Sequence, residues 1–291
     1  MQKPFISIIV PSLNAENTIE RCIKSLIDQE YPKNKCEIIV VDNNSQDATL
    51  ILLQKYGNWI TVLHENEQGS YRARNKAISY AKGQILAFTD SDCIADKNWL
   101  LSLSNGFRDK NVKIVGGRIR SFRLGSALLR YCSKFGHPQK YFINSKFPFF
   151  ATSNMAISKI HLGKSRFKGF LMSGGDYELC RRIVKKNDEI HYEPMAKVRH
   201  CYSNSLIKFA KKNFFYGTWH SIMAKNQSGA NFTPLPGLLT IWKKNGIHFL
   251  FLKILQDISF KLGICSGLMK NIFCSYRLPE REFIESLSLS R

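Results

Sequence analysis

Two carboxylates one residue apart, Asp90 and Asp92, are the side chains of this sequence best suited to hold a divalent cation. They follow the apolar run 85–89 directly, so we expect them at the end of a buried strand. Oxygen ligands suit Mg²⁺ or Mn²⁺, and these ions keep coordination positions for the phosphates of a substrate. The same spacing is common in solvated turns, and the position after the strand is what favours a metal site.

His200 could complete such a site, because it ends a second expected strand at 196–200. A neutral imidazole is a common metal ligand, and here it would join Asp92. A lone histidine is more often structural, so both roles stay open at this point.

Polar side chains also follow the first two expected strands. Pro11, Ser12 and Asn14 come after the apolar run 5–10, and Asp42 comes after the run 37–41. A carboxylate at such a strand end can accept hydrogen bonds from a base or a ribose. These residue types are equally suited to turns and helix caps, and the pattern does not decide between the two interpretations.

Two glycine-containing segments supply a cation and a further carboxylate. In 69–75, Arg74 follows a glycine that permits close backbone approach, so its guanidinium could contact phosphates or carboxylates. An exposed basic helix start is the alternative.

Gly174 and Gly175 precede Asp176 at the start of an expected helix, 176–186, whose dipole stabilises a carboxylate. Asp176 could take a proton from an attacking hydroxyl, with Glu178 as the weaker candidate, and a plain capping role for Asp176 is compatible with this.

The elements that must position these residues alternate between strand and helix. Strand patterns at 5–10, 37–41, 60–63 and 84–89 are separated by helix patterns at 19–29 and 72–81. This alternation predicts a mostly parallel sheet flanked by helices, an α/β fold. Because ligands of such sheets bind at the carboxyl ends of the strands, we expect the polar clusters along one edge.

Beyond residue 117 the pattern is less regular. Residues 118–150 favour no element, and two short strands are expected at 189–192 and 196–200. We therefore predict a first half at 1–117, a second half at 118–204, and a basic helical C-terminal extension at 205–291.

Charge is distributed very unevenly along the chain, whose net charge is +21. Residues 1–117 carry 14 Lys or Arg and 13 Asp or Glu, whereas residues 118–291 carry 29 and 9, a net of +20. Such an excess suits nucleic acid, an anionic membrane or a phosphorylated lipid better than a merely solubilising surface.

None of the eight cysteines forms a Cys-x-x-Cys pair and no leader pattern is present, which predicts a cytoplasmic protein.

The segment 246–274 is apolar, but charged residues interrupt it, so we do not expect it to span a membrane. Lys253, Gln256, Asp257 and Lys261 fall on one helical stripe and leave a wide apolar face. Such a helix fits a membrane interface and equally fits packing on its own domain.

Taken together and in their order along the chain, these motifs resemble those of the family 2 glycosyltransferases, which have the GT-A (Rossmann-like) fold. The resemblance extends from about residue 5 to residue 221. Segments 8–14, 40–47, 69–75 and 89–92 are similar to the family's nucleotide loop, nucleoside segment, glycine-rich segment and metal motif. Segments 152–156, 174–182 and 193–200 are similar to its acceptor-side segment, the block that carries the base and the strand that ends in a metal-side histidine.

The resemblance implies a role for each matching residue. It places on the donor Pro11, Ser12, Asn14, Asp42, Arg74 and Asp90. It implies Asp92 and His200 as ligands of Mn²⁺ or Mg²⁺, and Asp176 as the catalytic base. It places on the acceptor side Asn154, Gly174, Gly175 and Glu178.

Two departures from the family pattern matter. Gly175 stands where the family usually has an acidic residue before the base, which suggests a differently tuned loop. The Gln-x-x-Arg-Trp motif of processive synthases is missing, and 211–217 stands in its region. The second departure favours transfer of a single sugar over chain synthesis.

The sequence thus predicts an inverting glycosyltransferase that moves one sugar from a nucleotide sugar to a hydroxyl acceptor. The acceptor would be a glycan or a lipid-linked molecule in cell-surface glycan or lipid-linked oligosaccharide synthesis, with the protein peripheral at the inner face of the cell membrane. The rival is a catalytically degenerate protein that binds nucleotide sugars or nucleic acid. The intact Asp90, Asp92, Asp176 and His200 argue against degeneracy, and no specific nucleic-acid partner is expected.

Overall fold

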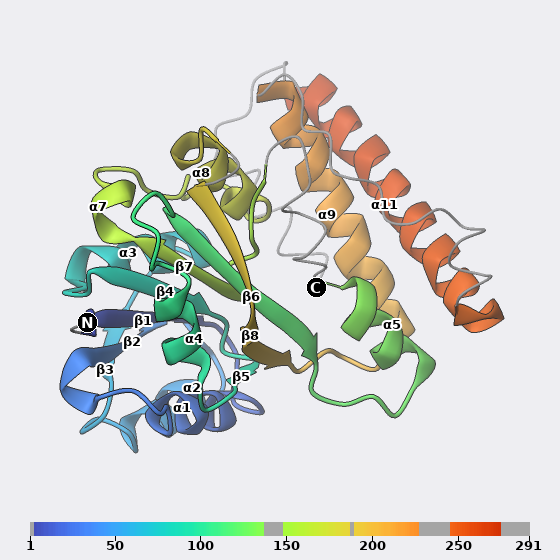
Figure 1. The fold of residues 1–291 in the computed structure, drawn as a ribbon. Coiled ribbons are helices and arrows are strands. Elements are labelled where there is room, and N and C mark those ends of the chain that lie inside the picture. The colour runs from blue at the N-terminus through green and yellow to red at the C-terminus, as the bar shows by residue number, and fades with distance from the viewer. Residues whose placement is uncertain (1–2, 137–147, 187–188, 227–244, 275–291) are drawn as a thin grey trace.

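One eight-stranded sheet organises the part of the chain that the computed structural model describes, residues 3–136, 148–186, 189–226 and 245–274. Its strands are β1 (Ile6–Ser12), β2 (Cys36–Asp42), β3 (Thr61–His64), β4 (Ile85–Thr89), β5 (Cys93–Ala95), β6 (Ile114–Ser121), β7 (Asn154–Ser158) and β8 (Ile190–His200). They lie in the order β3-β2-β1-β4-β7-β6-β8-β5 (Figure 1). The expected α/β sheet is therefore present, and it continues well beyond the first 117 residues.

The first half of the sheet is parallel: β1 pairs with β2 and β4, and β2 pairs with β3. Parallel neighbours need a crossover, and helices supply most of these connections. The helices of this half are α1 (Ile19–Ile27), α2 (Thr49–Gln54), α3 (Ser70–Tyr80) and α4 (Trp99–Asn105), with a 3₁₀ turn η1 (Lys33–Lys35) before β2. This arrangement brings the carboxyl ends of β1, β2 and β4 to one edge, as the sequence predicted.

Each face of the sheet has its own apolar core, because successive strand residues point to opposite faces. Ile8 and Val40 pack with α1, α2 and α4 on one face. Ile9 and Ile39 pack on the other face with α3, with α7 (Lys159–Leu162) and with α8 (Gly175–Ile183). Helices therefore cover both faces, and the polar chemistry is confined to the strand ends.

Beyond β4 the pairing changes direction. β7 is antiparallel to both β4 and β6, a strand that the sequence reading did not predict. β8 runs parallel to β6 and antiparallel to the short β5. The predicted boundary at 117 falls inside β6, so the two predicted halves share one sheet.

β8 is one strand and not the two short strands that the sequence suggested. Its register against β6 jumps, because Gly117 pairs with Glu193 while Arg118 pairs with Lys197. The three extra residues form a bulge, which tolerates Pro194 without a backbone donor. The bulge keeps the strand continuous as far as His200.

Asn154 fills this bulge with its side-chain amide. Its Nδ2 donates to the carbonyls of Arg118 at 3.0 Å and Ala196 at 2.9 Å, and its Oδ1 accepts from Trp99 Nε1 at 2.8 Å. The side chain is fully buried. Asn154 thus joins β6, β7, β8 and α4, and a contact with an acceptor would require these bonds to break.

The C-terminal extension begins with two packed helices that run in the same direction, since Asn213 contacts Gln256 and Ser221 lies against Gly267. α9 (Leu206–Asn226) packs along α11 (Ile247–Cys274), and α5 (Ala127–Phe135) joins them through Tyr131 and Phe135 (Figure 1). The sequence had left 118–150 without an element, so α5 is new. Within the described residues, no helix has both the length and the hydropathy required to cross a bilayer.

We predict that Asn154→Ala lowers the free energy of unfolding by about 2–5 kcal/mol, because it strands three buried hydrogen-bonding groups. Urea unfolding monitored by circular dichroism measures this. Asn111→Ala, in an exposed loop, is the control and should change stability little. An equally small effect of Asn154→Ala would mean that the bulge is held by its backbone alone.

Candidate functional site

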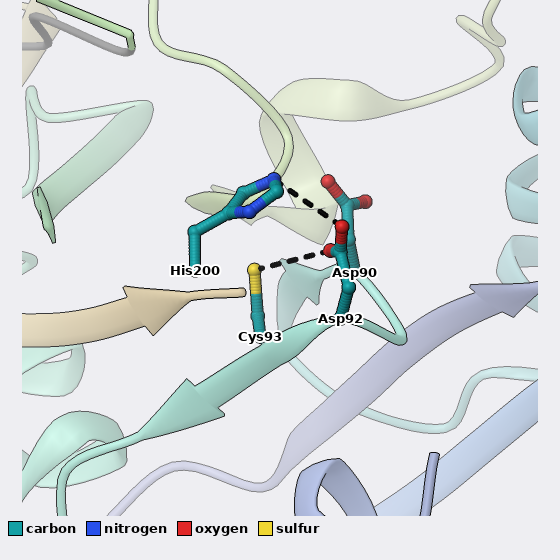
Figure 2. A group of neighbouring side chains, drawn as sticks. All are labelled: Asp90, Asp92, Cys93 and His200. Carbon is teal, nitrogen blue, oxygen red and sulfur yellow. Dashed lines mark hydrogen bonds and ion pairs between the residues drawn. The ribbon is translucent and has the colours of Figure 1, made fainter. Parts of the chain in front are cut away.

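Four side chains that can bind metals meet where β4 and β8 end. Asp90, Asp92, Cys93 and His200 offer ligand atoms that all lie within 4.8 Å of one another (Figure 2). The strand register causes this, because Cys93 of β5 pairs directly with His200 of β8. His200 Nε2 is 3.5 Å from Asp92 Oδ2. The structure therefore brings together the two predicted metal ligands, which are 108 positions apart in the chain.

The protonation states of this cluster favour a cation that prefers oxygen and imidazole ligands. Burial lowers the pKa of His200 to about 3, with Lys212 adding to the shift, so the ring is neutral. Burial raises the pKa of Cys93 well above its usual range, and the protonated thiol lies 3.8 Å from Asp92 Oδ1. Two carboxylates and a neutral imidazole fit Mn²⁺ or Mg²⁺, whereas a protonated thiol is a poor ligand.

Asp90 is held by the predicted arginine. Arg74 Nη2 donates to Asp90 Oδ1 at 2.6 Å, and Arg74 is almost completely buried. Its guanidinium also lies 5.3 Å from the centre of the Tyr71 ring. Among the described residues, Arg74 Nε has no hydrogen-bond partner, so this buried cation keeps one unused donor.

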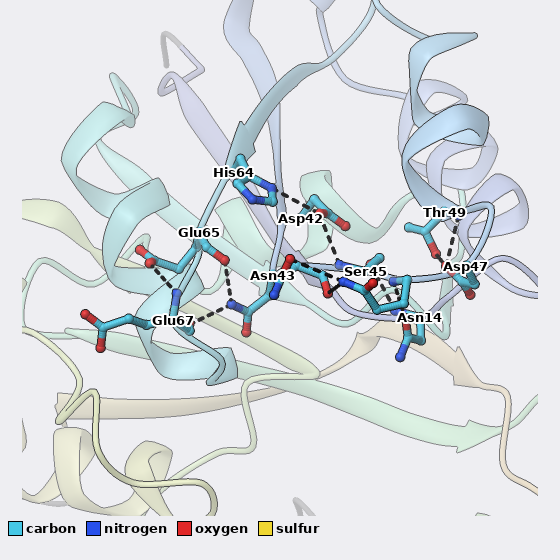
Figure 3. A network of polar contacts seen from close by, with 11 residues as sticks. Asn14, Asp42, Asn43, Ser45, Asp47, Thr49, His64, Glu65 and Glu67 are labelled. Carbon is cyan, nitrogen blue, oxygen red and sulfur yellow. Dashed lines mark hydrogen bonds and ion pairs between the residues drawn. The ribbon is translucent and has the colours of Figure 1, made fainter. Parts of the chain in front are cut away.

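The ends of β1 and β2 form a second polar group. Ser12 and Asp42 are register partners and both are buried. Asp42 Oδ2 accepts from the backbone N–H of Ser45 at 3.3 Å and lies 3.2 Å from Nδ1 of His64 (Figure 3). Within the described part of the chain, Ser12 Oγ and Asp42 Oδ1 have no partner. Buried polar atoms without partners are rare, and these two suit a ligand with hydroxyl or amide groups.

Asn14 has a local structural role in the same network. Its Oδ1 accepts from the backbone N–H of Gln46 at 2.8 Å, and its own N–H donates to Ser45 Oγ at 3.0 Å (Figure 3). Its φ of 49° is left-handed, a conformation that asparagine tolerates better than most residues. Asn14 therefore clips the loop after β1 to the loop after β2. Pro11 is buried inside β1, opposite Val41.

Asn43 connects this network to the helix that carries Arg74. Its Nδ2 donates to the carbonyls of Glu65 and Glu67, and its Oδ1 accepts from the N–H of Gly69 at 2.7 Å (Figure 3). Gly69 precedes α3 with a φ of 146°, which side chains rarely allow. The sequence alone gave Asn43 no separate role.

Asp176 lies in the first turn of α8, partly buried. Its Oδ1 accepts from the N–H of Tyr177 at 2.9 Å and lies 3.5 Å from the Tyr71 hydroxyl, and its Oδ2 accepts from the N–H of Thr152 at 3.4 Å. Burial raises the pKa of this carboxyl, while the Tyr177 N–H and Arg74 oppose the shift. A raised pKa makes a carboxylate a stronger base.

The structure explains the unusual glycine before Asp176. A Cβ on Gly175 would come within 2.7–2.8 Å of three atoms of the Tyr71 ring, so the ring occupies the space of a side chain there. Tyr71 thus contacts both Arg74 and Asp176, a role that sequence reasoning missed. Gly174 caps α8 with a φ of 76°, which favours glycine.

Glu178 is committed to ion pairs. It is buried, and it binds Arg182 at 2.9 Å and Lys168 at 3.2 Å. Both of its carboxylate oxygens contact these cations, so neither is left for the hydroxyl of an acceptor. Its geometry therefore favours Asp176 over Glu178 as the base.

Lys212 of α9 is the second functional candidate that sequence reasoning missed. Its Nζ lies 5.9 Å from the centre of the Tyr202 ring and 5.7 Å from that of Tyr216. Tyr202 in turn stacks on His200, with ring centres 4.2 Å apart. Interaction with Tyr216 raises the pKa of Lys212; burial opposes this shift and Asp92 adds to it. The lysine is therefore a cation beside the metal cluster. In the sequence, the spacing of four residues between Lys212 and Tyr216 is the one sign that the two side chains could meet on a helix.

Comparison with known proteins agrees with this geometry. The sequence matches the profile described as glycosyl transferase family 2 over residues 7–177. Since this match covers more than half of the chain, the protein belongs to glycosyl transferase family 2.

Individual relatives agree with the family assignment. The glycosyltransferase AglE of Haloferax volcanii is 34% identical over 188 residues, 62% of this chain and 62% of AglE. WfgD of Escherichia coli, a UDP-Glc:α-D-GlcNAc-diphosphoundecaprenol β-1,3-glucosyltransferase, is 34% identical over 146 residues, 50% of this chain and 55% of WfgD. The chain thus spans less than two thirds of the length of these relatives.

A solved structure confirms the GT-A fold. The mannosyltransferase PcManGT of Pyrobaculum calidifontis, in complex with GDP-Man and Mn²⁺, has a TM-score of 0.59 at 17% identity. The similarity covers 99% of this chain and 81% of PcManGT. Neighbours of this fold thus bind Mn²⁺, and the carboxylate group of this chain is of the kind that holds such a cation.

We predict that Lys212→Met weakens the binding of a nucleoside diphosphate in the presence of Mn²⁺ by about tenfold, the effect of one lost charge-assisted contact. Isothermal titration with UDP and GDP measures this. Lys208→Met, one turn earlier on α9, is the matched control. Equal losses in both variants would mean that only the overall charge matters.

Proposed function

We propose that this protein transfers one sugar from a nucleotide sugar to a hydroxyl group of a glycan or lipid-linked acceptor, with inversion at the anomeric carbon. One observation carries the proposal. Arg74 contacts Asp90 of the metal cluster, and Tyr71, which packs on Arg74, reaches Asp176. The side that would hold a diphosphate and the side that would hold a base are thereby built as one unit.

The donor end would be bound by the groups that lack partners. Ser12 Oγ and Asp42 Oδ1, which have no partner within the described residues, lie at the ends of β1 and β2, where a nucleoside would bind. Asp92 and His200 would hold the divalent cation, with Asp90 beside them, and the cation would neutralise the diphosphate as it leaves. Arg74 and Lys212 would add positive charge on the protein's side.

The acceptor end would use Asp176. Its carboxylate takes the hydroxyl proton as the acceptor oxygen forms its bond to the anomeric carbon. The bond from that carbon to the phosphate oxygen breaks at the same time, and the nucleoside diphosphate leaves with the electron pair. Attack from the face opposite the leaving group inverts the anomeric centre. The segment 211–217 lies within α9 and supports transfer of a single sugar.

A lipid-linked acceptor is supported by WfgD, whose name gives a diphosphoundecaprenol-linked sugar as its substrate. The net charge of +20 beyond residue 117 supports a location at an anionic surface, such as the inner face of the cell membrane. The catalytically degenerate alternative would bind nucleotide sugars without transferring the sugar. The next two experiments separate it from the enzyme.

We predict that Asp92→Asn lowers affinity for the correct nucleotide sugar in the presence of Mn²⁺ by about 10- to 100-fold, since a neutral amide is a weaker metal ligand. Isothermal titration across a panel of UDP- and GDP-sugars, with and without Mn²⁺, identifies the donor and measures the loss. Asp96→Asn is the control, because that exposed carboxylate pairs with Arg199 instead. Unchanged affinity in Asp92→Asn would remove Asp92 from the metal site.

We predict that Asp176→Asn slows transfer by about 100- to 10,000-fold and leaves donor affinity nearly unchanged, because only proton acceptance is lost. In the unmodified protein, kcat/KM should fall as the pH drops through the pKa of Asp176, which burial raises above 3.8. Product formation across pH measures both effects, with Asp109→Asn in an exposed loop as control. Substantial residual transfer by Asp176→Asn would refute the assignment.

A further inference from the structure

α11 has several polar residues inside and several large apolar residues outside. Part of the polar stripe found in the sequence faces the protein: Lys253 is 8% exposed and pairs with Asp257, whereas Lys261 is exposed. Gln256 accepts from the Tyr131 hydroxyl at 2.6 Å and donates to Asn213 at 3.2 Å. A helix on the surface of a water-soluble protein normally has the opposite arrangement.

The outward face of α11 forms a continuous apolar stripe. Large side chains lie three, four or seven residues apart, a helical spacing, and are 40–63% exposed. We call this set the outer stripe; its members are Ile247, Phe251, Ile254, Ile258, Leu262 and Met269. The stripe runs from residue 247 to residue 269 and so extends over most of α11. A contiguous apolar surface of this kind marks an interaction site.

The pair of helices α9 and α11 does not need the outer stripe for its own packing. α9 and α11 approach so closely that a Cβ on Gly263 would overlap the carbonyl of Phe214, and one on Gly217 would overlap that of Phe260. Small residues that let two helix backbones touch are typical of helix pairs in lipid. The inner face is therefore held by backbone proximity and polar contacts, which leaves the outer stripe for a different partner.

The charge around the helix pair indicates that this partner is an anionic surface. Residues 205–274 contain nine lysines and a single acidic residue, Asp257, which is paired with Lys253. A second copy of the chain docked on the same stripe would bring two such lysine-rich helix pairs together, which like-charge repulsion opposes. An anionic bilayer offers both apolar depth and negative charge.

We propose that the outer stripe of α11 docks the protein on an anionic lipid bilayer, with the helix lying in the interface. The same helix pair carries Lys212 on α9, close to His200 and Asp92. Docking through α11 would therefore hold the catalytic edge close to the bilayer, where a lipid-linked acceptor is found. This benefit for catalysis rests on the proposed function. The docking itself does not, because it requires neither donor nor acceptor.

Vesicle co-sedimentation tests the proposal with the full chain. The unmodified protein should bind vesicles of phosphatidylglycerol and phosphatidylcholine at low salt, and bind pure phosphatidylcholine much less. The triple variant Phe251→Ser, Ile258→Ser, Leu262→Ser should lose at least about tenfold in affinity, since three large side chains no longer enter the interface. The single variants Phe251→Ser and Leu262→Ser should each lose part of it, which keeps the test valid if the triple variant folds poorly.

The matched control removes three exposed apolar side chains from elsewhere, Ile51→Ser, Trp59→Ser and Ile160→Ser, which are 60–85% exposed. It should bind vesicles as the unmodified protein does. Absence of binding to anionic vesicles, or equal binding by the stripe variants, would overturn the proposal. So would an unmodified dimer that the triple variant converts to a monomer. Nucleotide-sugar titration of each variant shows separately whether the proposed function stands.

Discussion

The buried ion pair between Arg74 and Asp90 is the contact on which the site depends. A guanidinium that is almost fully removed from water needs a carboxylate partner, and at 2.6 Å it has one. Because Arg74 is on α3 and Asp90 follows β4, the ion pair fixes helix α3 against the end of a central strand of the sheet. Tyr71, one turn earlier on α3, then lies under Arg74 and against Gly175. The position of Asp176 is thus linked through two side chains to the position of the metal cluster.

Sheet register supplies the other constraint. Ser12 and Asp42 are neighbours because β1 and β2 pair in parallel, and Cys93 faces His200 because β5 and β8 pair antiparallel. The second pairing works only because the bulge at 194–196 corrects the register of β8 against β6. Asn154 stabilises that bulge from inside. Through this bulge, the buried amide of Asn154 is linked to the strand that brings His200 beside Asp92.

The sequence predicted the parts of the fold that follow from local pattern. Apolar runs located β1, β2, β3 and β4, and the rule that ligands bind at strand ends placed Asp42 and Asp90 at one edge. It could not predict the bulge, because the irregularity arises from the pairing of β8 with β6 and has no signal in β8 alone. Lys212 was missed for a similar reason, since its importance comes from the stacking of Tyr202 on His200 and not from its neighbours in the chain. Gly175 was noticed as a departure, but only the structure shows that the Tyr71 ring fills its space.

The distribution of charge is consistent with a division of work between the two parts of the chain. Residues 1–117 are nearly neutral, although they supply most of the candidate donor-binding residues. A nucleoside diphosphate is a compact anion, and one buried arginine, one nearby lysine and a divalent cation can neutralise it locally. The excess of +20 is therefore not required by the donor. It lies on the elements that include α9 and α11, where an extended anionic surface would make use of many weak contacts at once. The exposed apolar stripe of α11 points the same way, because isoleucine and phenylalanine side chains that face water mark a surface suited to an apolar partner.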